Sequence, residues 1–355
     1  MENVVVLIVG AGPAALATAA CLSQFSIPYV IVERESRSAS LWRNRAYDRL
    51  KLHLAKEFCE LPHMSYPLDA PTYIPKTLFV KYLDDYVERF NIQPYTIVSF
   101  TAKFLVVASD ENSAENIPMI PGLQSFLGDV IHSSSYMSGK SYSGMNVLVI
   151  GSGNSGMEIA YDLAAHGANT SIIIRSPIHV MTKELIRLGM TLAHHLPLNL
   201  VDNRLVMVAN LIFGDLSRYG IRWPKMGPMI LKSETGRSAV IDVGTAGLIR
   251  KGIIKVQGSI SKIMGDIVEF QCSKNISFDA IVFATGYKST TNIWLKNGEN
   301  MLNGNGLPIK EYLNHWKGEN GLYCAGLGWR GLAGIAADAK NIANDIKSVI
   351  GDMSG

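Results

Sequence analysis

The chain has 355 residues, with 33 Lys or Arg against 30 Asp or Glu and a net charge of +3. This length is sufficient for two ordinary domains with a large buried core. The charges form no basic block, which argues against nucleic-acid binding. Cys21, Cys59, Cys272 and Cys324 form no CxxC pair, so we expect a reduced, cytoplasmic setting and no redox-active dithiol. No cluster of His, Cys or carboxylates has metal-ligand spacing, so we expect no metal site.

The first predicted element is a strand, turn and helix within VVVLIVGAGPAALA, which starts at Val4. The stretch 4–22 is apolar but contains glycines and a proline and lacks a basic flank. We therefore interpret it as a buried strand and helix, not as a signal peptide or an integral membrane segment. Glycines at such a turn let the backbone approach a pyrophosphate, which the helix N-terminus then binds. The residues predicted to form this cradle are Gly10, Ala11, Gly12, Pro13, Ala14 and Ala15.

Glu33 ends the next predicted strand, YVIVE, 21 residues after Gly12. A carboxylate at this offset accepts hydrogen bonds from a ribose 2′-OH, so the first unit suits FAD or NAD. A lone charge at a strand end is more often simply solvated. The offset from the Gly-rich turn favours the ribose-binding interpretation.

The middle of the chain is mostly irregular as far as residue 75. A helix is predicted from an N-cap at Thr77 to Phe90, because apolar residues recur there with helical spacing. One short strand, YTIVSF, and a buried strand, KFLVVAS, follow. Pro118, Pro121 and Gly122 then indicate a linker.

The same pattern returns in NVLVIGSGNSGMEIA from Asn146, with a predicted helix over residues 154–166. Here the following strand, TSIIIR, ends at Arg175, 22 residues after Gly153. A guanidinium offers a forked set of donors to a 2′-phosphate, so this unit suits NADPH. The residues predicted to bind its phosphates are Gly151, Ser152, Gly153, Asn154, Ser155 and Gly156.

Further strands are predicted at IIKVQ, DIVEF and AIVFA, and residues 285–287 are predicted to mark the return of the chain to the first domain. The last segment is predicted to form a strand, a Gly-rich turn and a closing helix.

The predicted fold is therefore α/β, with two Rossmann-like dinucleotide-binding domains. The NADPH-binding domain (141–278) is inserted into a discontinuous FAD-binding domain (1–140 and 279–355).

Between the two turns, the segment from Phe126 through Gly128 and His132 to Tyr136 resembles the FxGxxxHxxx(Y/F) sequence of flavin-containing monooxygenases. Related Baeyer–Villiger monooxygenases carry tryptophan where Tyr136 stands, which makes that class less consistent with this chain. Taken alone, a histidine in this setting is more often a packed or exposed loop residue. The resemblance instead assigns His132 to hinge and cofactor positioning.

Several longer segments are similar to the plant YUCCA group of this family: YDRLKLHLAKEFCELP, GSGNSGMEIAYDLAAHGA, KMGP, AVIDVGT, FDAIVFATGYKS and RGLAGIAADA. The resemblance implies an FAD- and NADPH-dependent monooxygenase that uses O2 to convert indole-3-pyruvate to indole-3-acetate, the auxin, through a C4a-(hydro)peroxyflavin. It implies that Trp42, Leu52 and His53 lie near the flavin and that Gly326 and the turn from Gly331 approach FAD again. No catalytic side chain is required, because the cofactor carries the chemistry.

Three features depart from the family pattern. Ala15 replaces the usual third glycine, a change of one methyl group. Asp110 occupies a turn position that is typically glycine, where its carboxylate could repel phosphate. Only 13 residues lie between Phe90 and Phe104, where the family places a β-meander of a few dozen residues. The chain is therefore expected to be a shortened member.

Two alternatives remain open on the sequence. One is an N- or S-oxygenating flavin monooxygenase of the same fold. The other is a degenerate nucleotide-binding pseudoenzyme, which Asp110 and the missing meander favour and the two intact turns oppose.

Overall fold

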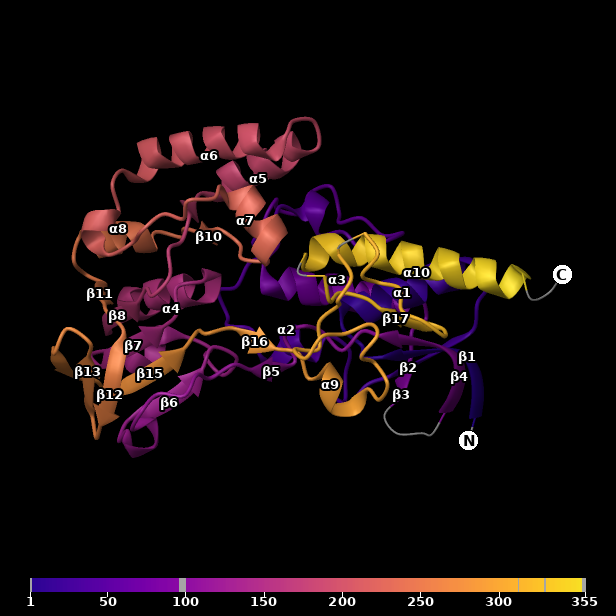
Figure 1. Cartoon of the computed structure of the whole chain (residues 1–355), viewed down its shortest axis with the longest axis horizontal. Coiled ribbons are helices and arrows are strands. Elements are labelled where there is room, and N and C mark those ends of the chain that lie inside the picture. Colours follow the sequence, from indigo (N-terminus) through magenta and orange to yellow (C-terminus); the bar gives the residue numbers. More distant parts are fainter. Residues whose placement is uncertain (1, 96–99, 312, 329, 353–355) are drawn as a thin grey trace. The chain divides into compact units, whose positions relative to one another are not determined.

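The computed structural model describes residues 2–95, 100–311, 313–328 and 330–352. The chain divides into two compact units, which Figure 1 traces by sequence colour. Unit 1 comprises Met1–Arg45, Leu50–Glu115 and Tyr287–Gly355. Unit 2 comprises Ala46–Arg49 and Asn116–Gly286.

Unit 1 is built on a five-stranded parallel sheet in the order β17-β4-β1-β2-β3. Its strands are β1 (Glu2–Val9), β2 (Tyr29–Val32), β3 (Pro94–Tyr95), β4 (Phe100–Val107) and β17 (Leu322–Cys324). The β-branched run in β1 suits a central strand, because such side chains pack well against neighbouring strands and covering helices. The fully buried Val6 and Ile8 belong to the core of this unit.

Helices from several parts of the chain belong to unit 1. They are α1 (Pro13–Gln24), α2 (Ser40–Asn44), α3 (Lys76–Arg89), α9 (Thr291–Trp294) and α10 (Leu332–Asp352), with a 3-10 turn, η1 (Lys56–Phe58). Figure 1 shows α10 running beside α1, and their buried residues, such as Leu16 and Ile342, share one core. A short antiparallel pair, β5 (Ala114–Glu115) with β16 (Tyr287–Lys288), also belongs to this unit.

The start of α3 differs from the predicted cap at Thr77. The N-cap is Pro75, in an extended conformation and without a side-chain hydrogen bond, so Thr77 lies inside the helix. Proline suits the position before the first helical residue, because it has no N–H to leave unpaired. After α3, the described residues form β3 and then β4. The predicted strand YTIVSF falls mostly on residues 96–99, outside the described residues.

Unit 2 contains a second five-stranded parallel sheet, in the order β11-β8-β7-β15-β6. Its strands are β6 (Asp129–His132), β7 (Asn146–Ile150), β8 (Asn169–Ile173), β11 (Lys255–Gln257) and β15 (Ala280–Phe283). A three-stranded antiparallel sheet and a two-stranded parallel pair accompany it. These are β12 (Ile260–Met264), β13 (Ile267–Phe270) and β14 (Asn275–Ser277), and β9 (Val180–Met181) with β10 (Val240–Ile241).

Unit 2 contains several helices, of which α4 connects β7 to β8. They are α4 (Asn154–Ala165), α5 (Lys183–Ala193), α6 (Leu198–Phe213), α7 (Pro228–Thr235) and α8 (Thr245–Arg250). The 3-10 turns are η2 (Leu123–Ser125), η3 (Gly139–Tyr142) and η4 (Ser217–Tyr219). α4 ends at Ala165 and is followed by Gly167, whose φ of +84° is the left-handed conformation that favours glycine after a helix.

The edges of the two units differ from the predicted boundaries at residues 140 and 278. β6 lies before residue 140, yet it pairs with β15 in the second sheet. β15 lies after residue 278, and it also pairs with β7 in that sheet. Strand pairing between distant segments decides which unit a segment joins, and the order of parallel strands cannot be read from local sequence.

Candidate nucleotide-binding sites

The first Gly-rich turn joins β1 to α1. Gly10 has φ of +107°, and a Cβ at this position would lie 2.4 Å from the carbonyl oxygen of Ala108. Gly12 is the N-cap of α1 and has no side-chain capping bond. Apart from the adjoining residues of its own turn and helix, no atom in the described part of the chain lies within 4 Å of the place that a Cβ would take at Gly12. The amide end of α1 is therefore open to a phosphate group, as the predicted FAD site requires.

Ala15 takes the third position of this turn and is fully buried. In the second turn the equivalent Gly156 packs more tightly, because a Cβ there would lie 2.1 Å from the carbonyl oxygen of Gly151. The first turn thus accommodates the extra methyl group that the second one excludes.

Glu33 follows β2 and is hydrogen-bonded to the turn itself. Its Oε2 accepts from the backbone N–H of Ala11 at 2.6 Å, and its Oε1 accepts from the N–H of Glu35 at 3.0 Å. The carboxylate is therefore fixed beside the turn and is not a freely solvated strand-end charge. Each carboxylate oxygen has further acceptor capacity, which leaves room for a ribose hydroxyl.

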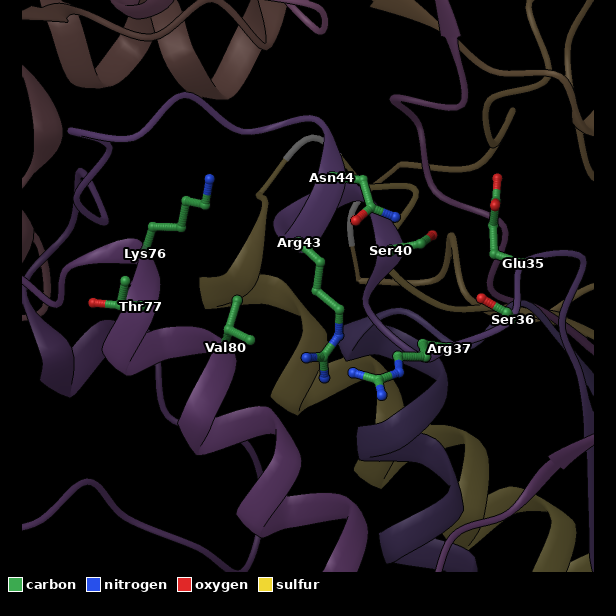
Figure 2. Close-up of a pocket in the computed structure, with 9 residues that line it drawn as sticks. All are labelled: Glu35, Ser36, Arg37, Ser40, Arg43, Asn44, Lys76, Thr77 and Val80. Atoms are coloured by element: carbon green, nitrogen blue, oxygen red, sulfur yellow. The ribbon is translucent and has the colours of Figure 1, made fainter. Parts of the chain in front are cut away.

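A cavity of about 440 Å³ opens just beyond Glu33, between the loop 35–37, α2 and α3. Figure 2 shows the guanidinium groups of Arg37 and Arg43 pointing toward the same space. Lys76 adds a third cationic side chain to the lining, against the single carboxylate of Glu35. Arg43 also forms an ion pair with Asp84 of α3. This excess of cations suits an anionic ligand.

Of the three residues expected beside the flavin, Leu52 belongs to the core of unit 1 and Trp42 packs against that core. The Trp42 ring lies edge-on to Phe79, with 4.6 Å between ring centroids. Leu52 is buried, and its N–H donates to the carbonyl of Ile74 at 2.8 Å. His53 is half-buried. These contacts account for Trp42 and Leu52 as packing residues, and a role beside the flavin stays a prediction.

The closing segment approaches the first turn again. Gly326 has φ of +75°, and a Cβ there would lie 2.9 Å from the Cβ of Ala14. Its N–H donates to Oδ2 of Asp338 at 3.0 Å. Gly331, with φ of +51°, lies immediately before α10 and has open space around it. Both glycines are thus placed where the backbone needs their conformational freedom.

Sequence reasoning missed the buried pair beneath this segment. His315 Nε2 lies 3.1 Å from Oδ1 of Asp338, and the two residues are only 3% and 2% exposed. Gly328 packs against the His315 ring, where a Cβ would lie 2.6 Å from Nε2. The distance in sequence between 315 and 338 gave no signal for this pair.

The second turn, between β7 and α4, repeats the geometry of the first. Gly151 has φ of +114°, and a Cβ there would lie 2.3 Å from the carbonyl oxygen of Ala284. Gly153 is the N-cap of α4, again without a side-chain cap and with open space around it. Ser152 and Ser155 are half-buried beside it. Oδ1 of Asn154 instead accepts from the N–H of Ile241 at 2.7 Å, which ties the helix start to β10.

Arg175 lies two residues beyond the end of β8 and is exposed. Within the described part of the chain it forms no hydrogen bond and no ion pair. Its guanidinium therefore remains available to a ligand, unlike the Glu33 carboxylate, which is already tied to its turn.

The segment Phe126–Tyr136 is fixed within unit 2. A Cβ at Gly128 would lie 2.1 Å from the carbonyl oxygen of Asp279, which explains the glycine. His132 is buried; its Nδ1 accepts from the N–H of Ser134 at 3.2 Å, and its Nε2 donates to the carbonyl of Gly286 at 3.0 Å. Both ring nitrogens are thus engaged in positioning the strand ends.

Asp110 has φ of +71°, so the turn after β4 does require the conformation for which the family uses glycine. Its Oδ1 accepts from both the backbone and the side-chain N–H groups of Asn112, each at 3.1 Å. Burial raises the pKa of Asp110 above its ordinary value. The carboxyl group thus sits where its charge is disfavoured.

The comparisons with known proteins decide between the families that share this fold. The chain is 49% identical to the probable indole-3-pyruvate monooxygenase YUCCA10 of Arabidopsis thaliana, over 99% of each chain. The chain belongs to the YUCCA family of flavin-binding monooxygenases. Residues 100–297 also match the family model described as flavin-binding monooxygenase-like. The rice (Oryza sativa subsp. japonica) indole-3-pyruvate monooxygenase YUCCA1 is 41% identical over 96% of this chain and 90% of its own.

Among solved structures, the flavin-containing monooxygenase from Stenotrophomonas maltophilia superposes on this YUCCA-family chain with a TM-score of 0.73. The alignment covers 99% of this chain and 100% of that one at 17% identity, which shows the two-domain Rossmann-like fold. The alignment with YUCCA10 spans 381 positions against 355 residues here, so at least 26 positions of the relative have no counterpart. The chain is therefore shorter than this YUCCA relative, as the sequence analysis predicted for a shortened member of the family.

None of the described helices combines the length and hydropathy needed to cross a bilayer. No group of three His, Cys, Asp or Glu residues in the same part of the chain is arranged to hold a metal ion.

Proposed function

We propose that this YUCCA-family enzyme uses FAD and NADPH to oxidise indole-3-pyruvate to indole-3-acetate with O2, releasing CO2. The enzyme class rests on family membership, and the substrate rests on the relative that is 49% identical over 99% of both chains. The observation in the structure that carries the proposal is the pair of open helix N-termini, at Gly12 and Gly153, each behind a positive-φ glycine. Such an arrangement binds two dinucleotides.

We assign FAD to the first site. The amides at the start of α1 would bind its pyrophosphate, and Glu33, held against Ala11, would accept from the ribose. The cationic cavity lined by Arg37 and Arg43 also contains Glu35, whose N–H donates to Glu33, and it would add positive potential near the cofactor. Gly326 and Gly331 would let the closing segment approach the cofactor.

NADPH is assigned to the second site. The amides at the start of α4 would bind its pyrophosphate, and the exposed Arg175 would pair with the 2′-phosphate. When bound, FAD supplies the redox centre that takes hydride from NADPH and activates O2. The side chains described here bind and orient the two nucleotides, and none of them is assigned as an acid, base or nucleophile.

We also propose a reducing, cytoplasmic compartment for the enzyme. Its four cysteines are all free thiols, and burial raises the pKa of Cys21 to about 11 and of Cys59 to about 12. Such thiols stay protonated and are inert packing groups.

The test begins with the colour of the purified protein. A yellow protein whose flavin absorbance is bleached by NADPH without oxygen, and which then converts indole-3-pyruvate to indole-3-acetate in air, supports the proposal. Oxidation of an amine or sulfide substrate in place of indole-3-pyruvate would support an N- or S-oxygenase. A colourless protein that FAD cannot reconstitute would refute the FAD assignment.

A further inference from the structure

Four residues from the first half of the chain belong to unit 2. Residues up to Arg45 and from Leu50 onward lie in unit 1, but Ala46–Arg49 lie in the same unit as the second nucleotide turn. This segment follows α2 directly in sequence, whereas α4 begins more than 100 residues later. A local sequence signal could not have indicated that the two are in contact.

The segment packs along one face of α4. Arg49 lies 3.6 Å from Oδ1 of Asp162, and its guanidinium carbon lies 4.6 Å from the ring centroid of Tyr161. Asp162 in turn accepts from the hydroxyl of Tyr136 and from the N–H of Gly139, both at 2.7 Å. These contacts hold the C-terminal half of α4 against the segment.

Tyr47 reaches the other end of the same helix. Its ring is buried, with 5% of the residue exposed, and its hydroxyl is shielded from solvent. The neighbouring polar side chains are Ser155 and Glu158, which lie on the first turns of α4 at a spacing of one helical turn. Ser155 is part of the Gly-rich turn itself. A tyrosine from the first half of the chain therefore lies beside the predicted NADPH phosphate site.

The Tyr47 hydroxyl interacts with the Glu158 and Ser155 side chains, but neither contact has the geometry of a standard hydrogen bond. A buried hydroxyl without a well-formed hydrogen bond is costly, so such a group generally forms one in the functional state. Burial, and after it the Glu158 carboxylate, raises the pKa of Tyr47, so the hydroxyl keeps its proton and remains a donor.

We propose that Tyr47 is a positioning residue for NADPH, whose hydroxyl hydrogen-bonds Ser155 in the nucleotide-bound enzyme and so orients the first turn of α4 toward the phosphates. This inference rests on the assignment of NADPH to the second turn. The contacts of Arg49 with Asp162 and Tyr161 keep the segment in place, while Tyr47 acts on the turn. The competing explanation is that Tyr47 only fills space in the core, in which case its hydroxyl has no effect on NADPH.

The test is anaerobic reduction of the FAD-loaded enzyme by increasing concentrations of NADPH, followed by flavin absorbance. Tyr47→Phe keeps the ring and removes only the hydroxyl, so packing is preserved. We expect the half-saturating NADPH concentration to rise about three- to tenfold, the effect of one hydrogen bond, with an unchanged limiting rate and unchanged FAD content. Tyr219→Phe is the matched control, because Tyr219 is 39% exposed and lies away from the turn in sequence.

A double-mutant cycle distinguishes a hydrogen bond between Tyr47 and Ser155 from a purely structural role of Tyr47. In a Ser155→Ala background, Tyr47→Phe is expected to have no further effect on half-saturation, because the partner is gone. Unchanged half-saturation in Tyr47→Phe, or full additivity with Ser155→Ala, would overturn the inference. If NADPH fails to bleach the wild-type enzyme, the NADPH assignment itself fails. A bleached wild type with an indistinguishable Tyr47→Phe refutes only the role of Tyr47.

Discussion

Replacing Arg175 with alanine gives the most direct test of nucleotide choice. The side chain is exposed beyond the end of β8 and makes no hydrogen bond or ion pair with the described residues. Its removal therefore costs the fold no such contact. Whatever activity is lost must come from the ligand that Arg175 binds.

The expected magnitude follows from the charges. A hydrogen bond to a charged group is worth about 1.5–3 kcal/mol, and each 1.4 kcal/mol is a factor of ten. Because Arg175 is exposed, solvent screening places the effect near the lower end. We expect the KM for NADPH to rise about tenfold in Arg175→Ala, while the KM for NADH, which lacks the 2′-phosphate, stays the same.

Steady-state NAD(P)H oxidation at several salt concentrations measures this effect. The preference of the wild type for NADPH over NADH should shrink as salt rises, since an exposed charge pair is screened, and Arg175→Ala should show little salt dependence. Arg250→Ala, an exposed arginine at the end of α8, serves as the control. Equal losses with both nucleotides, or no loss with either, would refute the assignment of Arg175 to the phosphate.

Three further changes test the first site and its neighbours. Gly12→Val introduces a side chain into space that is open in the described protein, so the variant should fold with a normal far-UV spectrum but purify without FAD; a fully yellow variant would contradict the pyrophosphate assignment. Asp110→Asn keeps an acceptor for Asn112 and removes a carboxyl group whose pKa is raised by folding. The folded state binds the Asp110 proton more tightly than the unfolded state does. This carboxyl group therefore lowers the stability of the wild type as pH rises from about 3.8 through its folded pKa. The urea midpoint of the variant should exceed that of the wild type by more at pH 7 than at pH 4. Asp338→Asn disrupts the buried pair with His315, so it should lower the unfolding free energy by about 2–3 kcal/mol and weaken FAD retention. The control is Asp352→Asn, which changes an exposed residue of the same helix. Equal urea midpoints for the two variants would argue against a stabilising role for the His315–Asp338 pair.

Much of the nucleotide-site geometry was local and therefore predictable. The glycines at 10 and 151 adopt positive φ where a Cβ would clash with the carbonyl of a neighbouring strand segment, and Gly12 and Gly153 begin the expected helices. The positive φ at Asp110 could be anticipated because a glycine position was recognised there. Helix α3 was found by its apolar spacing, although its first residue was not, since Pro75 and Thr77 both suit a helix start.

The features that sequence reasoning missed all join distant segments. Nothing near Asp338 indicates that His315 is its buried neighbour, and nothing near Tyr47 indicates Ser155. The placement of β6 and β15 in the second sheet likewise depends on pairing between strands some 150 residues apart. These contacts follow from the tertiary packing of whole elements, which a local pattern does not encode.

The sequence by itself determined the two nucleotide turns, the opposite charges of Glu33 and Arg175 and membership of the YUCCA family, because each depends on short motifs at fixed spacing. Only the tertiary structure decided how those charges are held. Glu33 is bound to the Ala11 amide, whereas Arg175 is exposed, because only the Glu33 side chain reaches a backbone donor of its own turn. The structure alone also brought the segment 46–49 onto α4, because burial of Tyr47 requires a surface that local sequence does not provide.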